Sequence, residues 1–311
     1  MSDMNSVTAA EAPEKLSAQP RRGKSDKNRS LAGDAWNDLR KSKIFWFAVV
    51  LVAAVLLMAA WPSLFTSADP NECALNRKHA GPSGGAIFGY DFQGCDVYAR
   101  TIYGARNSII VGIASTALAG IIGIIFGLSS GYFGGAVDAV LSRIIDIMLS
   151  IPFLLAGIVL SRRLSSDPND NGLLAVILTL GLLTWTSSAR VMRSAVIASK
   201  SQDYVAAGRM LGAGPGRLMF RHILPNSIAS FIVVLTILLG VNIGVEATLS
   251  FLGVGLKGDA ISWGIAISEG TGFARVASGP LVWPAVFLGL TVLAFIMLGD
   301  AIRDAFDPKL R

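Results

Sequence analysis

Residues 203–226 read DYVAAGRMLGAGPGRLMFRHILPN and connect two long apolar stretches of the chain. Residues 203–211 suit a short helix, because Asp203 stands near its start, where a carboxylate favours the positive end of a helix. The residues that then break the helix are Gly212, Gly214, Pro215 and Gly216. A second amphipathic turn leads to Leu224-Pro225. The sequence therefore predicts a short exposed helix with small surface residues, which allow the surface of a partner to approach closely.

Six apolar segments surround this stretch, and a membrane-spanning helix needs about 20 such residues. They are roughly 44–64, 108–130, 144–160, 173–189, 228–251 and 282–298. The third is short and contains Pro152, so we expect it to be tilted, kinked or extended backwards through Leu141. Of the 311 residues, 52% are hydrophobic and 15% are charged, whereas soluble domains have about 25% charged residues. The sequence predicts an all-α integral membrane protein with six transmembrane helices.

The distribution of Lys and Arg predicts the orientation of these helices, because basic residues favour the cytoplasmic side. If the N-terminus is inside, so are the N-terminal tail, Arg143, the 190–227 loop and the C-terminus. These regions hold more than two thirds of the 27 basic residues, so we expect both termini to be cytoplasmic. The same clusters account for the net charge of +6, and no nucleic-acid partner is expected.

The chain divides into three parts by composition. Residues 1–43 are rich in Ser, Ala, Lys, Arg and Asp without apolar periodicity, which predicts a disordered cytoplasmic tail. Residues 44–107 comprise the first transmembrane helix and an external loop, which is an insert between helices 1 and 2. Residues 108–311 form the core membrane domain, which includes the cytoplasmic loop 190–227.

Both cysteines of the chain, Cys73 and Cys95, lie in the predicted external loop. A position on the oxidising side of the membrane favours a disulfide between them. Such a bond would close a loop of about 20 residues and stabilise it by about 3 kcal/mol. Two free thiols are the alternative.

Glycines at four-residue spacing mark the faces on which helices pack. Gly123, Gly127 and Gly131 share one face of the second segment, and Gly240 and Gly244 share one face of the fifth. This spacing lets helix backbones approach closely in lipid. The pattern predicts a packed bundle and names no function.

Polar residues within apolar segments are candidates for function because they are costly to bury in a membrane. Asp146 lies near the start of the third segment, and Asn242 and Glu246 lie one turn apart on the fifth. They either tie helices together or line a transport path, and the sequence leaves both alternatives open.

The chain offers little with which to build a catalytic or metal site. The two histidines, His79 and His222, fall on opposite sides of the membrane in the predicted topology. Gly23-Lys24-Ser25 resembles the end of a nucleotide-binding loop, but Ala18 stands where the first glycine is needed and no apolar strand precedes it. We therefore predict no catalytic residue, metal ligand or bound cofactor, and any active transport needs a separate energy source.

The 203–226 stretch resembles the cytoplasmic loop of permeases of binding-protein-dependent ABC importers. Their motif reads Glu-Ala-Ala, three residues, Gly, nine residues, then Ile, any residue and Leu-Pro. Aligned on Gly212, Ala206 replaces the Glu and His222 replaces the Ile, while Leu224-Pro225 falls at the required distance. The residues that match the pattern of the peptide-permease branch better are Tyr204, Arg209, the triplet Leu211-Gly212-Ala213 and the run His222-Ile223-Leu224-Pro225-Asn226.

Three further stretches resemble the dipeptide/oligopeptide permease C-subunit family. They are FGYD at 88–91 with GCDVYAR at 94–100 and IYGARNS at 102–108, then SFLGVG at 250–255 with SWG at 262–264, and LGDAIRDAFDP at 298–308. Cys95 replaces a usual arginine. The resemblance covers about residues 35–311, and the four motifs follow one another in the order that the family has.

The resemblance implies the type I ABC importer permease fold and a subunit that forms half of a transport path for di- or oligopeptides. It also implies a homologous second permease subunit, two cytoplasmic ATPase subunits that hold ATP and Mg, and an external substrate-binding protein, in a bacterial cell membrane. The residues expected to couple to the ATPases are Asp203, Tyr204, Ala206, Ala207, Gly208, Arg209, Gly212, Ala213, Leu224 and Pro225. Nickel and glutathione importers share these motifs, and a stand-alone channel or secondary transporter is the alternative class.

Overall fold

The computed structural model describes residues 31–165 and 170–306, and its regular elements in these ranges are helices. The helices are α1 Leu31–Lys41, α2 Lys43–Ala60, α3 Val97–Phe133, α4 Gly135–Ser150, α5 Phe153–Leu164, α6 Leu173–Lys200, α7 Asp203–Met210, α8 Pro215–Arg217, α9 Leu224–Phe251, α10 Trp263–Thr271 and α11 Gly279–Phe306. A π-helical segment, Leu218–Ile223, joins α8 to α9. The predicted all-α fold is confirmed.

Five helical runs are long and apolar enough to cross a membrane within the described ranges: α2, α3, α6, Pro215–Phe251 and α11. Helices α4 and α5 qualify as a sixth span only as a pair, and they meet at an angle of 90°. Of the alternatives expected for the third segment, the structure shows both a kink and an extension backwards through Leu141. The cause of the kink is Pro152, because the residue before a proline avoids helical geometry, and Ile151 has extended backbone angles of φ −79° and ψ 128°.

Helices α3 and α6 pack against each other along the face of α3 that carries the glycine repeat. A Cβ at Gly127 would lie 2.5 Å from the carbonyl oxygen of Ala189, and one at Gly131 would lie 2.9 Å from that of Arg193. Any side chain at these positions would therefore push α6 away from α3. The predicted role of the repeat in close helix packing is confirmed.

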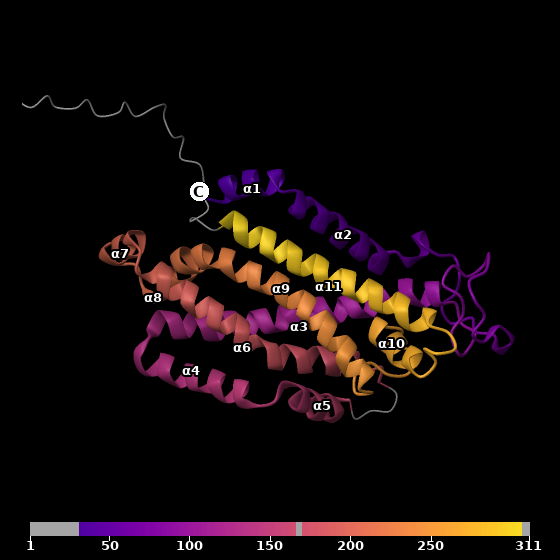
Figure 1. The fold of residues 1–311 in the computed structure, drawn as a ribbon. Coiled ribbons are helices and arrows are strands. Elements are labelled where there is room, and N and C mark those ends of the chain that lie inside the picture. The colour runs from indigo at the N-terminus through magenta and orange to yellow at the C-terminus, as the bar shows by residue number, and fades with distance from the viewer. Residues whose placement is uncertain (1–30, 166–169, 307–311) are drawn as a thin grey trace, which may run out of the picture.

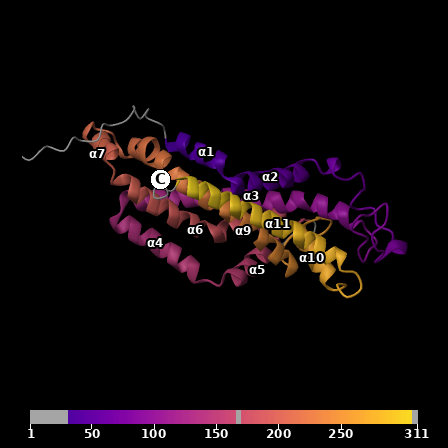
Figure 2. The same cartoon turned by 45° about the horizontal axis from the view of Figure 1, so that its top comes forward.

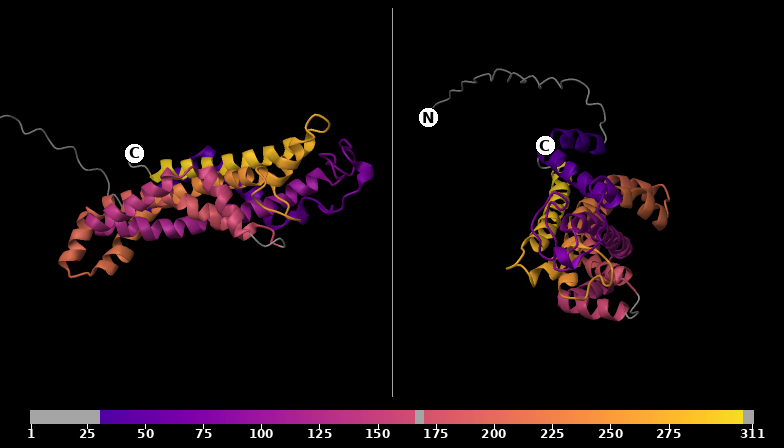
Figure 3. Two further views of the ribbon diagram at one scale, coloured as in Figure 1. Left: turned by 90° about the horizontal axis from the view of Figure 1, so that it is seen from below. Right: turned by 90° about the vertical axis from the view of Figure 1, so that its right-hand side faces the viewer.

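The bundle is elongated, with distinct structures at its two ends (Figure 1). One end carries α7, together with α1 and the C-terminal end of α11; we call it the α7 end. The opposite end carries residues 61–96, which we call the insert, and α10; we call it the insert end. The views in Figures 2 and 3 agree on this separation. Helices α4 and α5 lie on the flank opposite α1 and α2 (Figures 1 and 3).

The sequence predicts a disordered tail over residues 1–43, but the structure has a helix, α1, at Leu31–Lys41. Leu39 is buried against Ala301 and Ala305 of α11. The next helix, α2, begins with a side-chain cap, in which Ser42 Oγ accepts a hydrogen bond from the backbone N–H of Phe45 at 3.2 Å. Packing on α11 therefore stabilises a helix that the sequence pattern alone does not predict. Residues 1–30 of the predicted tail lie outside the described residues.

Candidate functional site

Helix α7 is a short helix with a well-formed C-terminal cap. The backbone N–H of Gly212 donates to Arg209 O at 3.0 Å, and that of Ala213 donates to Gly208 O at 3.1 Å. This pair of hydrogen bonds is the Schellman motif, which requires a left-handed residue after the helix. Gly212 has φ +80° and supplies that conformation. The predicted helix at 203–211 is therefore present at 203–210, and Gly212 ends it.

One side of α7 packs on the bundle and fixes its position. Val205 is completely buried, in a core cluster that includes Leu218, Ile223 and Met192. A Cβ at Gly208 would lie 3.2 Å from Leu218 Cδ2, so the small residue lets α7 approach the π-helical segment closely. These contacts hold the helix as a rigid projection at the α7 end.

The other side of α7 is exposed and combines small, apolar and charged residues. The exposed residues of this surface are Asp203, Tyr204, Ala206, Ala207, Arg209, Met210, Leu211 and Gly212. Met210 and Leu211 are 83% and 88% exposed, which is a large exposure for apolar side chains. We call this set the α7 surface. Its composition suits contact with another protein, because exposed apolar side chains among small residues allow close burial.

Four of the ten predicted coupling residues lie outside the α7 surface. Gly208 and Ala213 are half-buried, and Ala213 packs on the core cluster beneath α7. Leu224 is half-buried against the same cluster, while Pro225 is exposed. The structure thus brings these residues together at one end of the bundle, on both sides of the turn that follows α7.

Pro225 lies inside a continuous helical run, Pro215–Phe251. Proline has no N–H to donate to the preceding turn, and the π-helical segment Leu218–Ile223 directly precedes it. The side chain of Asn226 donates to His222 O at 2.6 Å, and Ser227 Oγ donates to Ile223 O at 3.0 Å. The helix therefore continues through Pro225, and only the turn 211–214 separates α7 from this long helical run.

Helix α6 enters α7 through a short turn at Ser201 and Gln202, and ion pairs hold α6 to α4. Arg193 of α6 donates to both carboxylate oxygens of Asp138 in α4, each at 2.6 Å. Arg190 pairs with Asp146 at 2.9 Å, where both side chains are about half exposed. Sequence reasoning missed the Asp138–Arg193 pair, since nothing in the sequence pairs residues so far apart.

The two predicted polar residues of α9 also contact other helices. Asn242 is buried, and its Nδ2 donates to Thr116 Oγ1 of α3 at 2.9 Å. Glu246 is buried and accepts a hydrogen bond from Ser108 of α3. With Asp146 bonded to α6, each of the three candidates contacts a second helix. Within the described residues, no group of three or more His, Cys, Asp or Glu could hold a metal ion.

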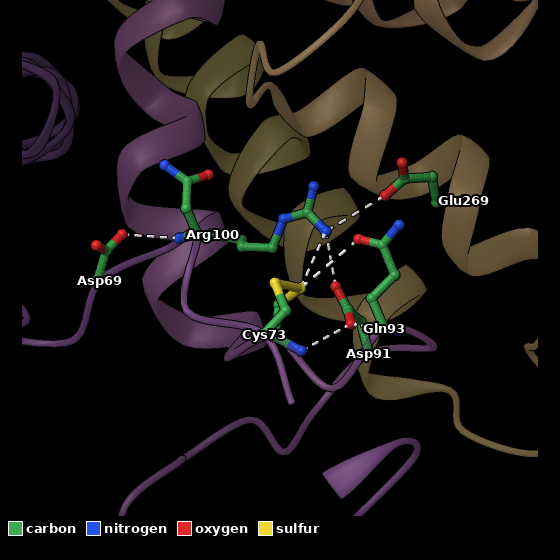
Figure 4. Close-up of a disulfide and its surroundings, with 8 residues drawn as sticks. Asp69, Cys73, Asp91, Gln93, Arg100 and Glu269 are labelled. Carbon is green, nitrogen blue, oxygen red and sulfur yellow. Dashed lines mark hydrogen bonds and ion pairs between the residues drawn. A yellow bond between two sulfur atoms is a disulfide. The ribbon is translucent and has the colours of Figure 1, made fainter. Parts of the chain in front are cut away.

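At the insert end, Cys73 and Cys95 form a disulfide, as predicted. Asp91 lies beside it and accepts a hydrogen bond from the backbone N–H of Cys95 at 2.9 Å. Arg100 of α3 pairs with Asp91 at 2.7 Å and with Glu269 of α10 at 3.5 Å (Figure 4). Burial raises the pKa of the Glu269 carboxyl, while the charge of Arg100 opposes the rise. Arg100 therefore connects the disulfide-bonded insert to α10.

Aromatic contacts dock the insert on α11 and on the loop between α10 and α11. Phe88 stacks on Trp283 of α11 with ring centroids 4.1 Å apart, and Phe92 stacks on Phe273 at 5.1 Å. The ring of His79 also lies 5.0 Å from that of Phe273. The insert is therefore part of the folded bundle end.

Solved structures with the same arrangement of helices are of the inward-facing methionine ABC transporter MetNI. One crystal form superposes with a TM-score of 0.54 and 21% identity, covering 66% of this chain and 96% of that chain. A second form gives a TM-score of 0.52, covering 66% and 95%. At this identity the likeness defines the fold, which is that of a type I ABC importer permease.

The chain belongs to the family of binding-protein-dependent transport system inner membrane components, whose family model matches residues 123–311. The N-terminal transmembrane domain of oligopeptide transport permease C matches residues 30–82. The chain is thus a multi-pass membrane protein of an inner-membrane permease family, and the resemblance inferred from its motifs is confirmed.

Three relatives are similar over nearly the whole chain. The oligopeptide transport system permease protein OppC of Bacillus subtilis is 37% identical, over 92% of each chain. The dipeptide transport system permease protein DppC of the same organism is 34% identical, over 91% of this chain and 87% of its own. The glutathione transport system permease protein GsiD of Pectobacterium atrosepticum is 31% identical, over 89% and 90%.

Proposed function

We propose that this chain is one of two permease subunits of an ATP-driven importer of di- and oligopeptides, and that it forms half of the transport path. The relatives named for oligopeptide and dipeptide transport have 37% and 34% identity, against 31% for the glutathione relative. The peptide-permease pattern around Gly212 and the match of residues 30–82 to the oligopeptide permease domain support the same substrate class.

The observation that carries the proposal is that the α7 surface is exposed on a helix whose other side packs firmly on the bundle. Helix α7 projects from the bundle with exposed Met210 and Leu211, and it is fixed from below by Val205. Both of its neighbours in the chain are long helices, α6 and the run Pro215–Phe251. A partner that moves α7 therefore moves two spans with it, as in a rigid-body transition.

We infer that this partner is a cytoplasmic ATPase, one of a pair that binds ATP and Mg. The permease chain itself then has no catalytic role and binds no cofactor. In this arrangement the α7 end and both chain termini face the cytoplasm. The insert end faces outward, towards a substrate-binding protein, on the side where the disulfide is stable.

The apolar flanks of the bundle suit the lipid bilayer and a second, homologous permease subunit. Helices α4 and α5 expose Val140, Ile147 and Leu155 by more than half of their surface. Side chains of this kind are favourable against lipid or against another apolar helix.

Uptake by a reconstituted complex tests the proposal. The chain would be co-expressed with its partner permease, ATPases and binding protein, and placed in proteoliposomes with labelled dipeptide, pentapeptide, glutathione or nickel. We expect ATP-dependent uptake of at least one of the two peptides, and co-purification of an ATPase and a second permease. Uptake of glutathione or nickel alone would contradict the substrate class. Transport by the isolated chain, without ATP, would contradict the importer class.

A further inference from the structure

Glu246 lies at the junction of three elements near the insert end. The residue has no exposed surface. Its Oε2 accepts a hydrogen bond from Ser108 Oγ of α3 at 3.1 Å, and its Oε1 accepts one from Ser250 Oγ of α9 at 2.9 Å. A buried carboxyl group is costly unless its oxygens have donors. Both oxygens are satisfied here, so the carboxyl group fixes the position of each serine.

Each serine hydroxyl also accepts a hydrogen bond from a backbone N–H group beyond α9. Ser250 Oγ accepts a hydrogen bond from the N–H of Leu256 at 3.3 Å. Ser108 Oγ accepts one from the N–H of Trp263, the first residue of α10, at 3.4 Å. The N–H group of Leu256, in the α9–α10 connection, and that of Trp263, at the start of α10, are thus each linked to Glu246 through one serine hydroxyl.

The start of α10 is packed closely on both helices that this cluster joins. A Cβ at Gly264 would lie 2.6 Å from Ala247 Cα of α9, and one at Gly104 of α3 would lie 3.4 Å from Trp263 N. The indole of Trp263 is completely buried, and its Nε1 donates to Thr101 O of α3 at 2.8 Å. So little free space remains that α10 cannot rotate independently of α3 and α9.

We propose that Glu246 is a positioning residue that anchors the α9–α10 connection to α9 and α3, so that the insert end of the bundle follows the movement of α9. The inference rests on the proposed function, in which ATPases drive the other end of the run Pro215–Phe251 through α7. Glu246 acts through Ser108 and Ser250 and need not contact the transported molecule.

Hydrogen exchange and uptake together test the anchor in the assembled complex. The variants are Glu246→Ala, which removes both acceptors, and Glu246→Gln, which keeps the shape and can bond both hydroxyls. Thr248→Val is the control, because Thr248 lies on the exposed side of the same helix and bonds only within it. Exchange is measured in lipid nanodiscs over residues 252–264, and uptake and ATP hydrolysis are measured in proteoliposomes.

We expect Glu246→Ala to accelerate exchange in this segment about tenfold, because Ser108 and Ser250, which accept the N–H groups of Trp263 and Leu256, lose the carboxyl group that positions them. Uptake should fall about tenfold while ATP hydrolysis continues, which is the signature of lost transmission. Glu246→Gln should restore both uptake and slow exchange, and Thr248→Val should resemble the parent. If Glu246→Ala does not assemble, Ser250→Ala provides the second test, with the same acceleration of exchange expected.

Three results would overturn the inference. They are unchanged exchange in both Glu246→Ala and Ser250→Ala, faster exchange with unchanged uptake, and a Glu246→Gln variant as defective as Glu246→Ala. Absence of peptide uptake by the parent complex would instead contradict the proposed function. The exchange measurement requires no transport, so it would still decide whether Glu246 is an anchor.

Discussion

Arg193 of α6 donates two hydrogen bonds to the carboxylate of Asp138 in α4, each 2.6 Å long. Asp138 also accepts hydrogen bonds from Ser130 of α3 and Ser142 of α4, so a single carboxylate joins three helices. The pair lies near the α7 end, seven residues before the last residue of α6. It therefore fixes α4 to the helix that enters α7.

We predict that Arg193→Lys lowers the free energy of unfolding by about 1–3 kcal/mol, because lysine cannot form the two-pronged pair. Thermal unfolding in detergent measures the loss. The matched control is Arg190→Lys, whose partner Asp146 is about half exposed, and which should cost less than about 1 kcal/mol. Equal losses in the two variants would contradict the structural importance of the Asp138 pair.

Gly212→Asp should abolish uptake and uncouple ATP hydrolysis, while the complex still assembles. Gly212 has φ +80°, a conformation that an aspartate adopts with strain, and its missing Cβ points into open space. The new carboxylate would therefore disturb the α7 surface and leave the bundle core unchanged. Gly214→Ala is the control, since Gly214 has an ordinary φ of −68° and nothing within 4 Å of a Cβ. Full transport by Gly212→Asp would refute the coupling role.

Cys73→Ser should leave Cys95 as a free thiol and lower the free energy of unfolding of the insert by about 2–5 kcal/mol. The loss follows because the unfolded chain is no longer constrained by a cross-link between residues 73 and 95. A membrane-impermeant maleimide applied to intact cells checks both the accessibility and the side of the membrane, once mild denaturation exposes the thiol. Labelling only after the cells are opened would contradict an external insert.

Stability of the insert end should depend on pH through Glu269. Burial raises the pKa of its carboxyl in the folded protein above the unfolded value. The protonated carboxyl therefore favours the folded state at low pH, and this contribution is lost as pH rises through the folded pKa. Glu269→Gln keeps a neutral side chain, so its melting temperature relative to the parent should rise with pH above about 4.5. A difference that stays constant with pH would contradict this assignment.

The sequence predicts the apolar spans and the short helix because their signals are local. Asp203 and Gly212 mark the two ends of α7, and Pro152 marks the break between α4 and α5. The apolar runs nevertheless underestimate helix length. Helix α3 begins at Val97 and not near residue 108, because the cap by Asp96 starts it within polar sequence.

The features that the sequence does not predict depend on contacts between distant residues. Helix α1 is stabilised by Leu39 against α11, a contact across most of the chain length. The pairing of Asp138 with Arg193 likewise requires the fold that brings α4 beside α6. Asn242 and Glu246 are visible as unusual polar residues, but only the structure identifies Thr116, Ser108 and Ser250 as their partners.

The most direct test of the account is photo-crosslinking from the α7 surface in the assembled complex. A benzophenone amino acid would replace Leu211, which is 88% exposed at the α7 end, with Leu75, 77% exposed in the insert, as the control position. We predict an adduct between position 211 and an ATPase subunit, and none with an ATPase from position 75. Adducts of position 211 with lipid alone, in a complex that contains its ATPases, would contradict the central claim that an ATPase subunit binds α7.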